Sequence, residues 1–321
     1  MHVTCHPERA AVVGNSLGLG PASDEVVGIP DSLSCGPAAP VRDLTAWCAE
    51  REAWWRSSDG APGEDLPENH YPGLLETCER ALAAPELTLW LEPGANYQLL
   101  AGWLAELLLA RGADVRVDLV QVERDALLTP TRLGRGRPRK RASLSDLERL
   151  AEVWRVWCAP TPDPILEYIA NPARPALSRA ALRTLLDHYP RSQDGLNHWE
   201  WRCLHALRDH SPVVARAICD TLIRPDGDGC EEIGDLWLLG RLRRLGAARL
   251  RFPLLEFGST SVPRIGFGTA RLTDAGESVI AGTADAITLN GIEDRVGGVT
   301  LKSPGGPVWR RSESGLERTD R

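Results

Sequence analysis

The first half of the chain alternates short apolar runs with longer amphipathic stretches. The apolar runs are short and rich in Val, Ile or Leu, and they predict strands over residues 2–5, 25–29, 87–91 and 115–120. Between them, apolar positions recur at helical spacing over 8–17, 41–56, 72–84 and 96–111, and Gly112 is placed to end the last of these helices. Strands that alternate with helices favour a parallel sheet with helices on its faces. We therefore predict an α/β fold, a small parallel sheet with flanking helices, for the N-terminal half.

The pattern becomes mainly helical in the second half. Helical spacing covers 143–158, 176–189, 196–208, 212–223 and 233–245, with Ser143 as the expected N-cap of the first of these helices. In the helix 233–245 the expected apolar face consists of Leu236, Leu239 and Leu242. A glycine-rich turn, a short strand at 269–273 and a helix at 274–281 follow. Three helices, a β-ribbon and such a strand-to-helix junction are typical of winged-helix domains, and such junctions also occur in helical repeats and docking modules. We predict a mainly helical domain with a winged-helix-like module.

Charge is distributed unevenly along the chain. The protein has 321 residues and a formal net charge of −7. Residues 1–131 carry 8 basic and 20 acidic side chains, residues 132–141 carry 6 basic and no acidic ones, and residues 142–321 carry 23 and 24. The acidic first half would repel a phosphate backbone. We predict an α/β domain over 1–125, a basic linker over 126–142, and a helical plus winged-helix-like domain over 143–321.

Short motifs in both halves resemble two bacterial families. In the N-terminal half the motifs are His2-Val3, Asp31-Ser32-Leu33-Ser34-Cys35-Gly36-Pro37, Leu89-Trp90-Leu91-Glu92 and Ala95-Asn96-Tyr97-Gln98-Leu99. In the C-terminal half they are Trp154, Asp163-Pro164, Tyr189-Pro190, Gly195-Leu196, Gly234-Asp235, Leu272-Thr273 with Gly276, Gly297-Gly298-Val299 and Trp309. With these motifs the N-terminal half resembles the family known as domain of unknown function 1835, and the rest resembles its usual companion, domain of unknown function 3658. The resemblance implies a two-domain architecture but no established chemistry. The chain departs from the family at His6-Pro7-Glu8, where relatives usually have a Gly-Asp-Ser type turn.

Polar residues follow three of the predicted strands. They are His6 and Glu8 after the first strand, Asp31, Ser32 and Ser34 after the second, and Glu92, Asn96 and Gln98 after the third. Ligands of open α/β sheets bind beyond the carboxyl ends of the strands, so we expect these residues to form a site for a small polar ligand. Such a set could perform acid–base chemistry or hold the ligand without reacting. In the structural alternative, Asp31 caps a turn, Asn96 caps the following helix and His6 occupies a loop.

Two groups of cations are candidates for nucleic-acid binding. Arg135, Arg137, Arg139, Lys140 and Arg141 lie in a segment that matches the core of an AT-hook, in which arginines enter a narrow A·T minor groove. An ordinary basic linker explains the same residues. Arg241, Arg243 and Arg244 lie on the helix that would be the recognition helix of a winged-helix module. The acidic residues at the start of that helix oppose phosphate binding, which leaves both DNA and a protein open as the partner.

Several other classes of site lack their signatures. The glycine-rich run 14–20 falls at the end of a helix and contains no P-loop lysine. His198 and His205 have no third metal ligand at suitable spacing. The apolar run 99–110 is too short to span a bilayer and contains Glu106, and the chain begins without the pattern of a secretory signal. We therefore expect no cofactor, no metal, no membrane association and a cytoplasmic location.

Two classes of function follow from these observations. In the first, the α/β half binds a small polar molecule and the winged-helix-like half contacts DNA or a protein partner. In the second, the protein is an enzyme that acts on a small polar substrate through His6, Asp31, Ser32 and Glu92. The sequence favours the first class, because it contains no complete catalytic signature.

Overall fold

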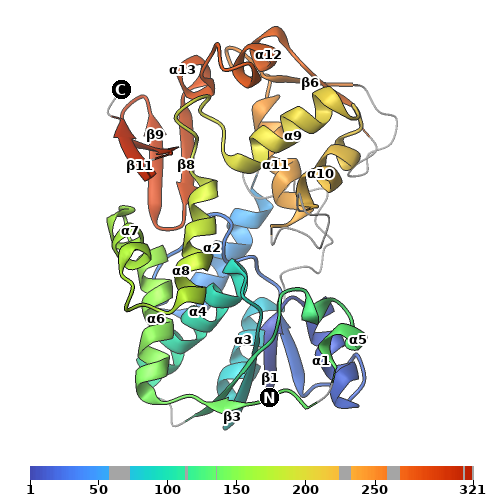
Figure 1. The fold of residues 1–321 in the computed structure, drawn as a ribbon, viewed down its shortest axis with the longest axis vertical. Helices are drawn as coiled ribbons and strands as arrows, with labels where there is room; N and C mark the ends of the chain where they lie inside the picture. Colours follow the sequence, from blue (N-terminus) through green and yellow to red (C-terminus); the bar gives the residue numbers. More distant parts are fainter. Residues whose placement is uncertain are drawn as a thin grey trace. The chain divides into compact units, whose positions relative to one another are not determined.

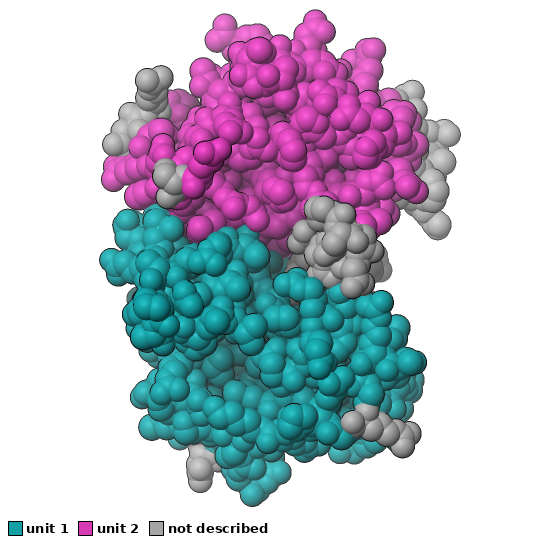
Figure 2. Space-filling model, viewed as in Figure 1, with its two compact units in different colours: residues 1–34, 38–52, 68–184 teal, residues 35–37, 53–67, 185–321 magenta. Residues whose placement is uncertain are grey.

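The structure of the chain is a computed structural model that describes residues 1–57, 73–112, 115–134, 136–223, 233–258, 268–313 and 315–319 (Figure 1). The chain divides into two compact units (Figure 2). Unit 1 comprises residues 1–34 and 38–52 and the described residues of 68–184. Unit 2 comprises residues 35–37 and the described residues of 53–67 and 185–321.

Unit 1 is built on a five-stranded, mostly parallel sheet. Its strands are β1 (His2–Cys5), β2 (Val26–Ile29), β3 (Glu86–Leu91), β4 (Arg116–Gln121) and β5 (Lys140–Arg141), in the order β2-β1-β3-β4-β5. The first four strands are parallel, and β5 runs antiparallel to β4. In β3 five consecutive residues, 87–91, are buried, as expected for a parallel strand covered on both faces. The predicted α/β fold of the N-terminal half is thus confirmed.

Helices cover both faces of this sheet. The helices up to residue 185 are α1 (Pro7–Leu17), α2 (Leu44–Arg56), α3 (Leu74–Ala83), α4 (Ala95–Arg111), α5 (Pro130–Leu133), α6 (Leu144–Trp157), α7 (Asp163–Ala170) and α8 (Ala176–Leu185), with a 3₁₀ turn, η1 (Ala126–Leu128). Because β2 and β3 lie on opposite sides of β1 and parallel crossovers are right-handed, α1 packs on one face and α3 and α4 on the other. Gly112 ends α4 in the left-handed conformation that its position predicts.

The helix α6 packs against α4 and therefore belongs to unit 1. A Cβ atom on Gly102 of α4 would lie 2.7 Å from the carbonyl oxygen of Leu150 in α6, so the two helices approach closely at this glycine. Ser143 is the N-cap of α6, as predicted, and it forms a capping box with Asp146. Unit 1 thus extends to residue 184, whereas the sequence predicted that the second domain begins at 143.

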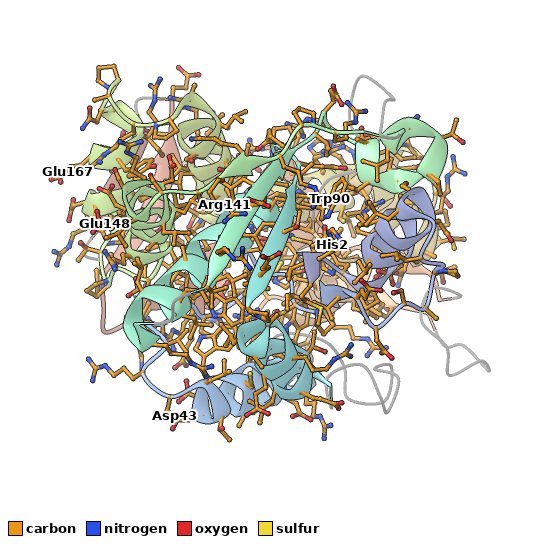
Figure 3. The ribbon with its side chains drawn as sticks, turned by 90° about the horizontal axis from the view of Figure 1, so that it is seen from below. His2, Asp43, Trp90, Arg141, Glu148 and Glu167 are labelled. Carbon is orange, nitrogen blue, oxygen red and sulfur yellow. The ribbon has the colours of Figure 1, made fainter. Side chains whose placement is uncertain are left out.

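The segment predicted as a basic linker is part of the same unit. Residues 126–133 form η1 and α5, and β5 pairs with β4 through Asp118 with Arg141 and Leu119 with Lys140. Figure 3 shows Arg141 on this edge strand, and His2 beside Trp90 on β1 and β3. The indole nitrogen of Trp90 donates to Nδ1 of His2 over 3.1 Å.

Unit 2 combines helices with three antiparallel hairpins. Its elements are a 3₁₀ turn, η2 (Leu186–His188), the helices α9 (His198–Asp209), α10 (Val214–Leu222), α11 (Asp235–Leu245), α12 (Asp274–Ile280) and α13 (Ala286–Asn290), and the strands β6 (Leu255–Phe257), β7 (Ala270–Leu272), β8 (Ile292–Val296), β9 (Val299–Ser303), β10 (Val308–Ser312) and β11 (Gly315–Thr319). The hairpins are β6–β7, β8–β9 and β10–β11. The sequence did not predict the β8–β9 and β10–β11 hairpins.

The buried face of α11 differs from the predicted one. Trp237, Leu238, Leu239 and Leu242 are buried in the core of unit 2, while Leu236 is partly exposed. Burial extends without interruption from 237 to 242, so α11 is covered on most of its circumference. A helix buried all round presents no open face to a partner over these residues.

Candidate functional site

The loop that follows β2 is held by a buried ion pair. Arg51 on α2 donates from Nε and Nη2 to the two carboxylate oxygens of Asp31 over 2.7 and 2.6 Å. The same guanidinium also donates to the carbonyl oxygen of Ser32 over 3.2 Å. Both side chains are almost fully buried, with 4% of Arg51 and 0% of Asp31 exposed. The Asp31 carboxylate is thus neutralised by a residue that sequence reasoning did not single out.

Other predicted strand-end residues hold the surrounding loops and helices. Oδ1 of Asn96 accepts a hydrogen bond from the backbone nitrogen of Ser34 over 3.0 Å, so Asn96 binds the loop after β2 and does not cap its own helix. Oε1 of Gln98 accepts from the hydroxyl of Ser178 on α8 over 3.0 Å. These four residues are buried and bonded within unit 1.

Glu92 binds the backbone of η1. Its two carboxylate oxygens accept from the backbone nitrogens of Asp125 and Leu127 over 3.1 and 2.6 Å. Arg9 on α1 donates to the carbonyl oxygen of Leu127 over 3.3 Å. Burial raises the pKa of the Glu92 carboxyl above its ordinary value, although the two N–H groups oppose the shift. The η1 turn therefore lies against the end of β3, at the edge of the sheet where a ligand was expected.

His6 and Glu8 lie in the turn from β1 into α1, the helix whose Arg9 contacts η1. His6 has a positive φ of 57° and precedes the first residue of the helix, and Glu8 is exposed in the first turn.

The hydrogen bonds given above do not join the eight predicted ligand-site residues into one group. Asn96 binds the loop that contains Asp31, Ser32 and Ser34, whereas Glu92 binds η1 and Gln98 binds Ser178. His6 and Glu8 lie at the start of α1. Of the structural alternative, His6 lies as expected, in the turn before α1. Asp31 is paired with Arg51, an interaction that the alternative did not include, and Asn96 caps no helix.

The basic segment is also engaged within unit 1. Three of its side chains form ion pairs at 2.6–3.1 Å, Arg137 with Glu123, Lys140 with Asp146, and Arg141 with Asp118. Burial, together with the charge of Arg139, lowers the pKa of His2 to about 4. Arg135 lies outside the described residues. An AT-hook needs an extended arm with unpaired arginines, so the pairing of Arg137, Lys140 and Arg141 argues against that interpretation.

The three arginines of α11 have different environments. Arg241 is only 8% exposed, and Arg244 donates from Nη2 to the carbonyl oxygen of Glu293 over 2.6 Å. Arg243 is exposed. The prediction that Arg241 contacts nucleic acid is therefore wrong, because a buried guanidinium cannot reach a phosphate.

Arg241 instead forms the centre of a buried ion cluster. Its Nε donates to Oε1 of Glu200 over 2.8 Å, and its Nη1 contacts the Asp294 carboxylate on β8. The other Glu200 oxygen accepts from the backbone nitrogen of Asn197 over 2.9 Å, which completes a capping box at the start of α9. Burial alone would lower the pKa of Arg241, but the two carboxylates raise it above its ordinary value. Arg241 therefore stays charged, and the cluster ties α9, α11 and β8 together.

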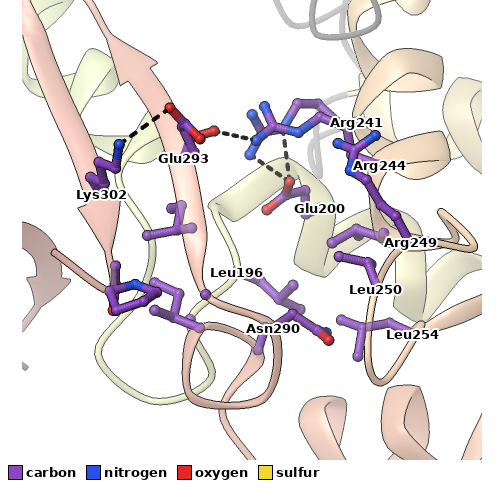
Figure 4. Close-up of a pocket in the computed structure, with 18 residues that line it drawn as sticks. Leu196, Glu200, Arg241, Arg244, Arg249, Leu250, Leu254, Asn290, Glu293 and Lys302 are labelled. Atoms are coloured by element: carbon purple, nitrogen blue, oxygen red, sulfur yellow. Dashed lines mark hydrogen bonds and ion pairs between the residues drawn. The ribbon is translucent and has the colours of Figure 1, made fainter.

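A pocket of about 410 Å³ lies beside this cluster (Figure 4). Its polar wall contains Glu200, Arg241 and Arg244, and Glu293 and Lys302 lie on the same side. Leu196, Leu250 and Leu254 line the opposite side, with Asn290 beside them. All lining residues belong to unit 2 and lie within the described ranges.

Sequence reasoning missed this pocket. The lining residues come from four separate segments, around 195–200, 241–254, 286–293 and 302–304. One local signal was present: Arg241 follows Trp237 and Leu238 at helical spacing, which places it on the same buried face of α11. An arginine on a buried face requires carboxylate partners, and Glu200 and Asp294 supply them.

The chain was compared with known proteins. No protein-family model matches it, and no curated protein sequence matches it significantly. The resemblance to the two families of unknown function therefore stays a proposal. Within the described residues, no helix has both the length and the apolar character that a membrane crossing requires, and no group of three or more His, Cys, Asp or Glu side chains is placed to hold a metal ion.

Proposed function

We propose that this protein is a small-molecule-binding regulatory protein whose ligand occupies the pocket of unit 2. The observation that carries the proposal is the pocket itself: a volume of about 410 Å³ with one charged wall and one apolar wall. Ligand pockets commonly combine mostly apolar surface with a few polar groups that orient the ligand.

The polar wall is fixed in position by the protein's own contacts. Arg241 is bonded to Glu200 and Asp294, and Arg244 is bonded to the backbone of Glu293. Side chains that are already immobilised lose little conformational entropy when a ligand binds. This preorganisation of the polar wall supports the proposal that the pocket binds a ligand and is not simply a gap in the packing of unit 2.

We further propose that α9, α10, α11 and the β6–β7 hairpin form a winged-helix-like module. Val213, just before α10, pairs antiparallel with Thr269, which adds a third short strand to the β6–β7 ribbon. The backbone bonds from Val214 to Gly268 and from Ala270 to Pro212, at 2.9 and 2.8 Å, support the same arrangement. The order helix, short strand, two helices and ribbon is that of a winged helix.

The contacts of α11 argue against DNA reading by this helix, so we propose a protein partner that contacts the module outside residues 237–242. A DNA-reading helix needs an exposed face, whereas residues 237–242 are buried and Arg244 is held by β8. The pocket touches both α11 and β8, so a bound ligand would strengthen the contact between them. In this proposal, ligand occupancy controls the surface that unit 2 offers to its partner.

The alternative enzyme function receives little support from the strand-end contacts. Asp31 is paired with Arg51, and each carboxylate oxygen of Glu92 accepts a hydrogen bond from a backbone N–H group. A general acid or base must reach the substrate's proton, which these contacts oppose. We also keep as a proposal that the two halves belong to the families of unknown function that they resemble.

A thermal-shift screen against a panel of small metabolites tests the binding proposal. We expect at least one compound to raise the melting temperature of the wild-type protein. The variant Leu250→Trp places a large side chain in the pocket at a partly exposed position, and we expect it to abolish that shift. Leu177→Trp, at an exposed leucine of α8 in unit 1, is the matched control and is expected to keep it. A shift that persists unchanged in Leu250→Trp would contradict the proposal.

A further inference from the structure

The two walls of the unit 2 pocket differ in chemistry. The partly exposed apolar residues that line the pocket are Leu245, Leu250 and Ile292, which offer no hydrogen-bonding side chain to a ligand, whereas Leu196 and Leu254 are fully buried. Asn290 lies beside the apolar wall, but its amide is already bonded to the backbone of Phe252 at both ends, over 2.9 and 2.8 Å. A ligand that fills the pocket therefore needs an apolar body on this side.

The charges around the pocket leave one cation in excess. The lining cations are Arg241, Arg244, Arg249 and Lys302, and the carboxylates that line the pocket or bond to its cations are Glu200, Glu293 and Asp294. Arg241 is paired with Glu200 and Asp294, Arg244 also lies 3.4 Å from Asp294, and Lys302 lies 3.7 Å from Glu293. Among the described residues, these four cations and three carboxylates leave a single positive charge.

Arg249 is the cation that provides this excess. It is exposed, it lines the pocket, and within the described part of the chain no carboxylate lies within ion-pair distance of it. A guanidinium binds a carboxylate through two parallel hydrogen bonds, which matches a ligand head group of one negative charge. A second negative charge would face the carboxylates of the same pocket without a cation to balance it.

We infer that the ligand is an amphipathic monocarboxylate, with its carboxylate on Arg249 and its apolar body against the leucine wall. The inference rests on the proposed function, because it names the class of ligand for the same pocket. An amine would be repelled by Arg249, and a small polyanion would leave the apolar wall in contact with water.

Titration calorimetry with octanoate, octanamide and octylamine tests the inference, because the three compounds share one apolar body and differ in head-group charge. We expect octanoate to bind wild-type protein at least tenfold more tightly than octanamide and octylamine. Arg249→Gln removes the cation, and we expect it to weaken octanoate binding about tenfold while octanamide binding stays unchanged. Arg183→Gln, at an exposed arginine of α8, is the matched control and is expected to keep the wild-type preference.

The outcomes separate the ligand class from the proposed function. If octanamide binds as tightly as octanoate and Leu250→Trp abolishes both, the pocket binds ligands but the carboxylate inference is overturned. The same holds if none of the three compounds binds while Leu250→Trp removes the shift caused by another compound of the metabolite panel. If Leu250→Trp leaves every observed binding event unchanged, the proposed function itself fails, and the inference fails with it.

Discussion

Asp31 and Arg51 depend on each other because both are buried. Either side chain alone would be an uncompensated charge in the interior of unit 1. The sequence showed Asp31 as a polar residue after a strand, but it could not show that its partner lies 20 residues further on, on another element. Glu92 is a similar case, because its partners are backbone N–H groups more than 30 residues away, which no side-chain motif marks.

We expect Arg51→Met to lower the free energy of unfolding by about 3–5 kcal/mol, because it leaves the Asp31 carboxylate buried without a counter-charge. Urea unfolding measures the loss, and the double variant Asp31→Asn with Arg51→Met is expected to recover part of it. Arg80→Met breaks an exposed ion pair with Asp24 and is expected to cost far less. Equal losses for Arg51→Met and Arg80→Met would be inconsistent with a buried pair.

His188 makes the stability of unit 2 depend on pH. Its ring is buried between Trp199 and Trp237, with centroids 4.5 and 5.2 Å away. Burial, with Arg241 nearby, lowers the pKa of His188 to about 3 from an ordinary value of 6.5. Between these pH values the unfolded chain binds a proton here that the folded chain does not, so the free energy of unfolding falls as pH falls.

The slope from this one group reaches about 1.4 kcal/mol per pH unit. We expect His188→Phe, which keeps an aromatic ring between the two tryptophans, to remove that contribution. Urea unfolding of the variant and of wild-type protein at several pH values from 6.5 down to about 4.5 measures the difference. If the free energy of unfolding depended on pH in the same way in both proteins, His188 would bind its proton equally in the folded and unfolded states, which would contradict the prediction.

At the scale of elements, local patterns predicted most of unit 1 and the helices α9 to α12. Apolar runs and helical spacing are properties of neighbouring residues, so they carry over directly into β1 to β4 and the main helices. The β8–β9 hairpin was missed, because three consecutive charged residues, 293–295, separate the two apolar residues of β8 and break the alternation typical of a strand. Its turn, Gly297-Gly298 between two valines, was the available signal.

The placement of α6 in unit 1 depends on the close approach of α4 and α6, which no local pattern encodes. We expect Gly102→Ala to destabilise the protein by about 1–3 kcal/mol, because the added methyl group would meet the backbone of α6. Helix propensity alone would predict that Gly102→Ala stabilises the protein, because alanine is the better helix former. Gly234→Ala has open space around the added atom and is expected to have a smaller effect in the same thermal or urea unfolding experiment. A stabilising Gly102→Ala would contradict this packing.

At the scale of the whole molecule, the uneven charge of the sequence does not mark the candidate site. The acidic first half suggested a ligand site there, and the basic segment suggested a nucleic-acid contact. In the structure many of these charges are paired within unit 1, while the pocket lies in the nearly neutral part of the chain. Four segments that are distant in sequence build that pocket, so only the fold could bring its charged and apolar walls together.

Hydrogen–deuterium exchange with and without the strongest stabiliser of the metabolite panel tests the central claim most directly. If the ligand occupies the unit 2 pocket, exchange slows in peptides that cover residues 241–254 and 286–304, which contain most of the lining residues. Peptides that cover 6–9, 31–34 and 92–98, at the strand ends of unit 1, keep their rates. Slower exchange at the strand ends, with no change around the pocket, would contradict the proposal that the ligand occupies the unit 2 pocket. It would indicate that the ligand binds in the α/β half, as the sequence predicted.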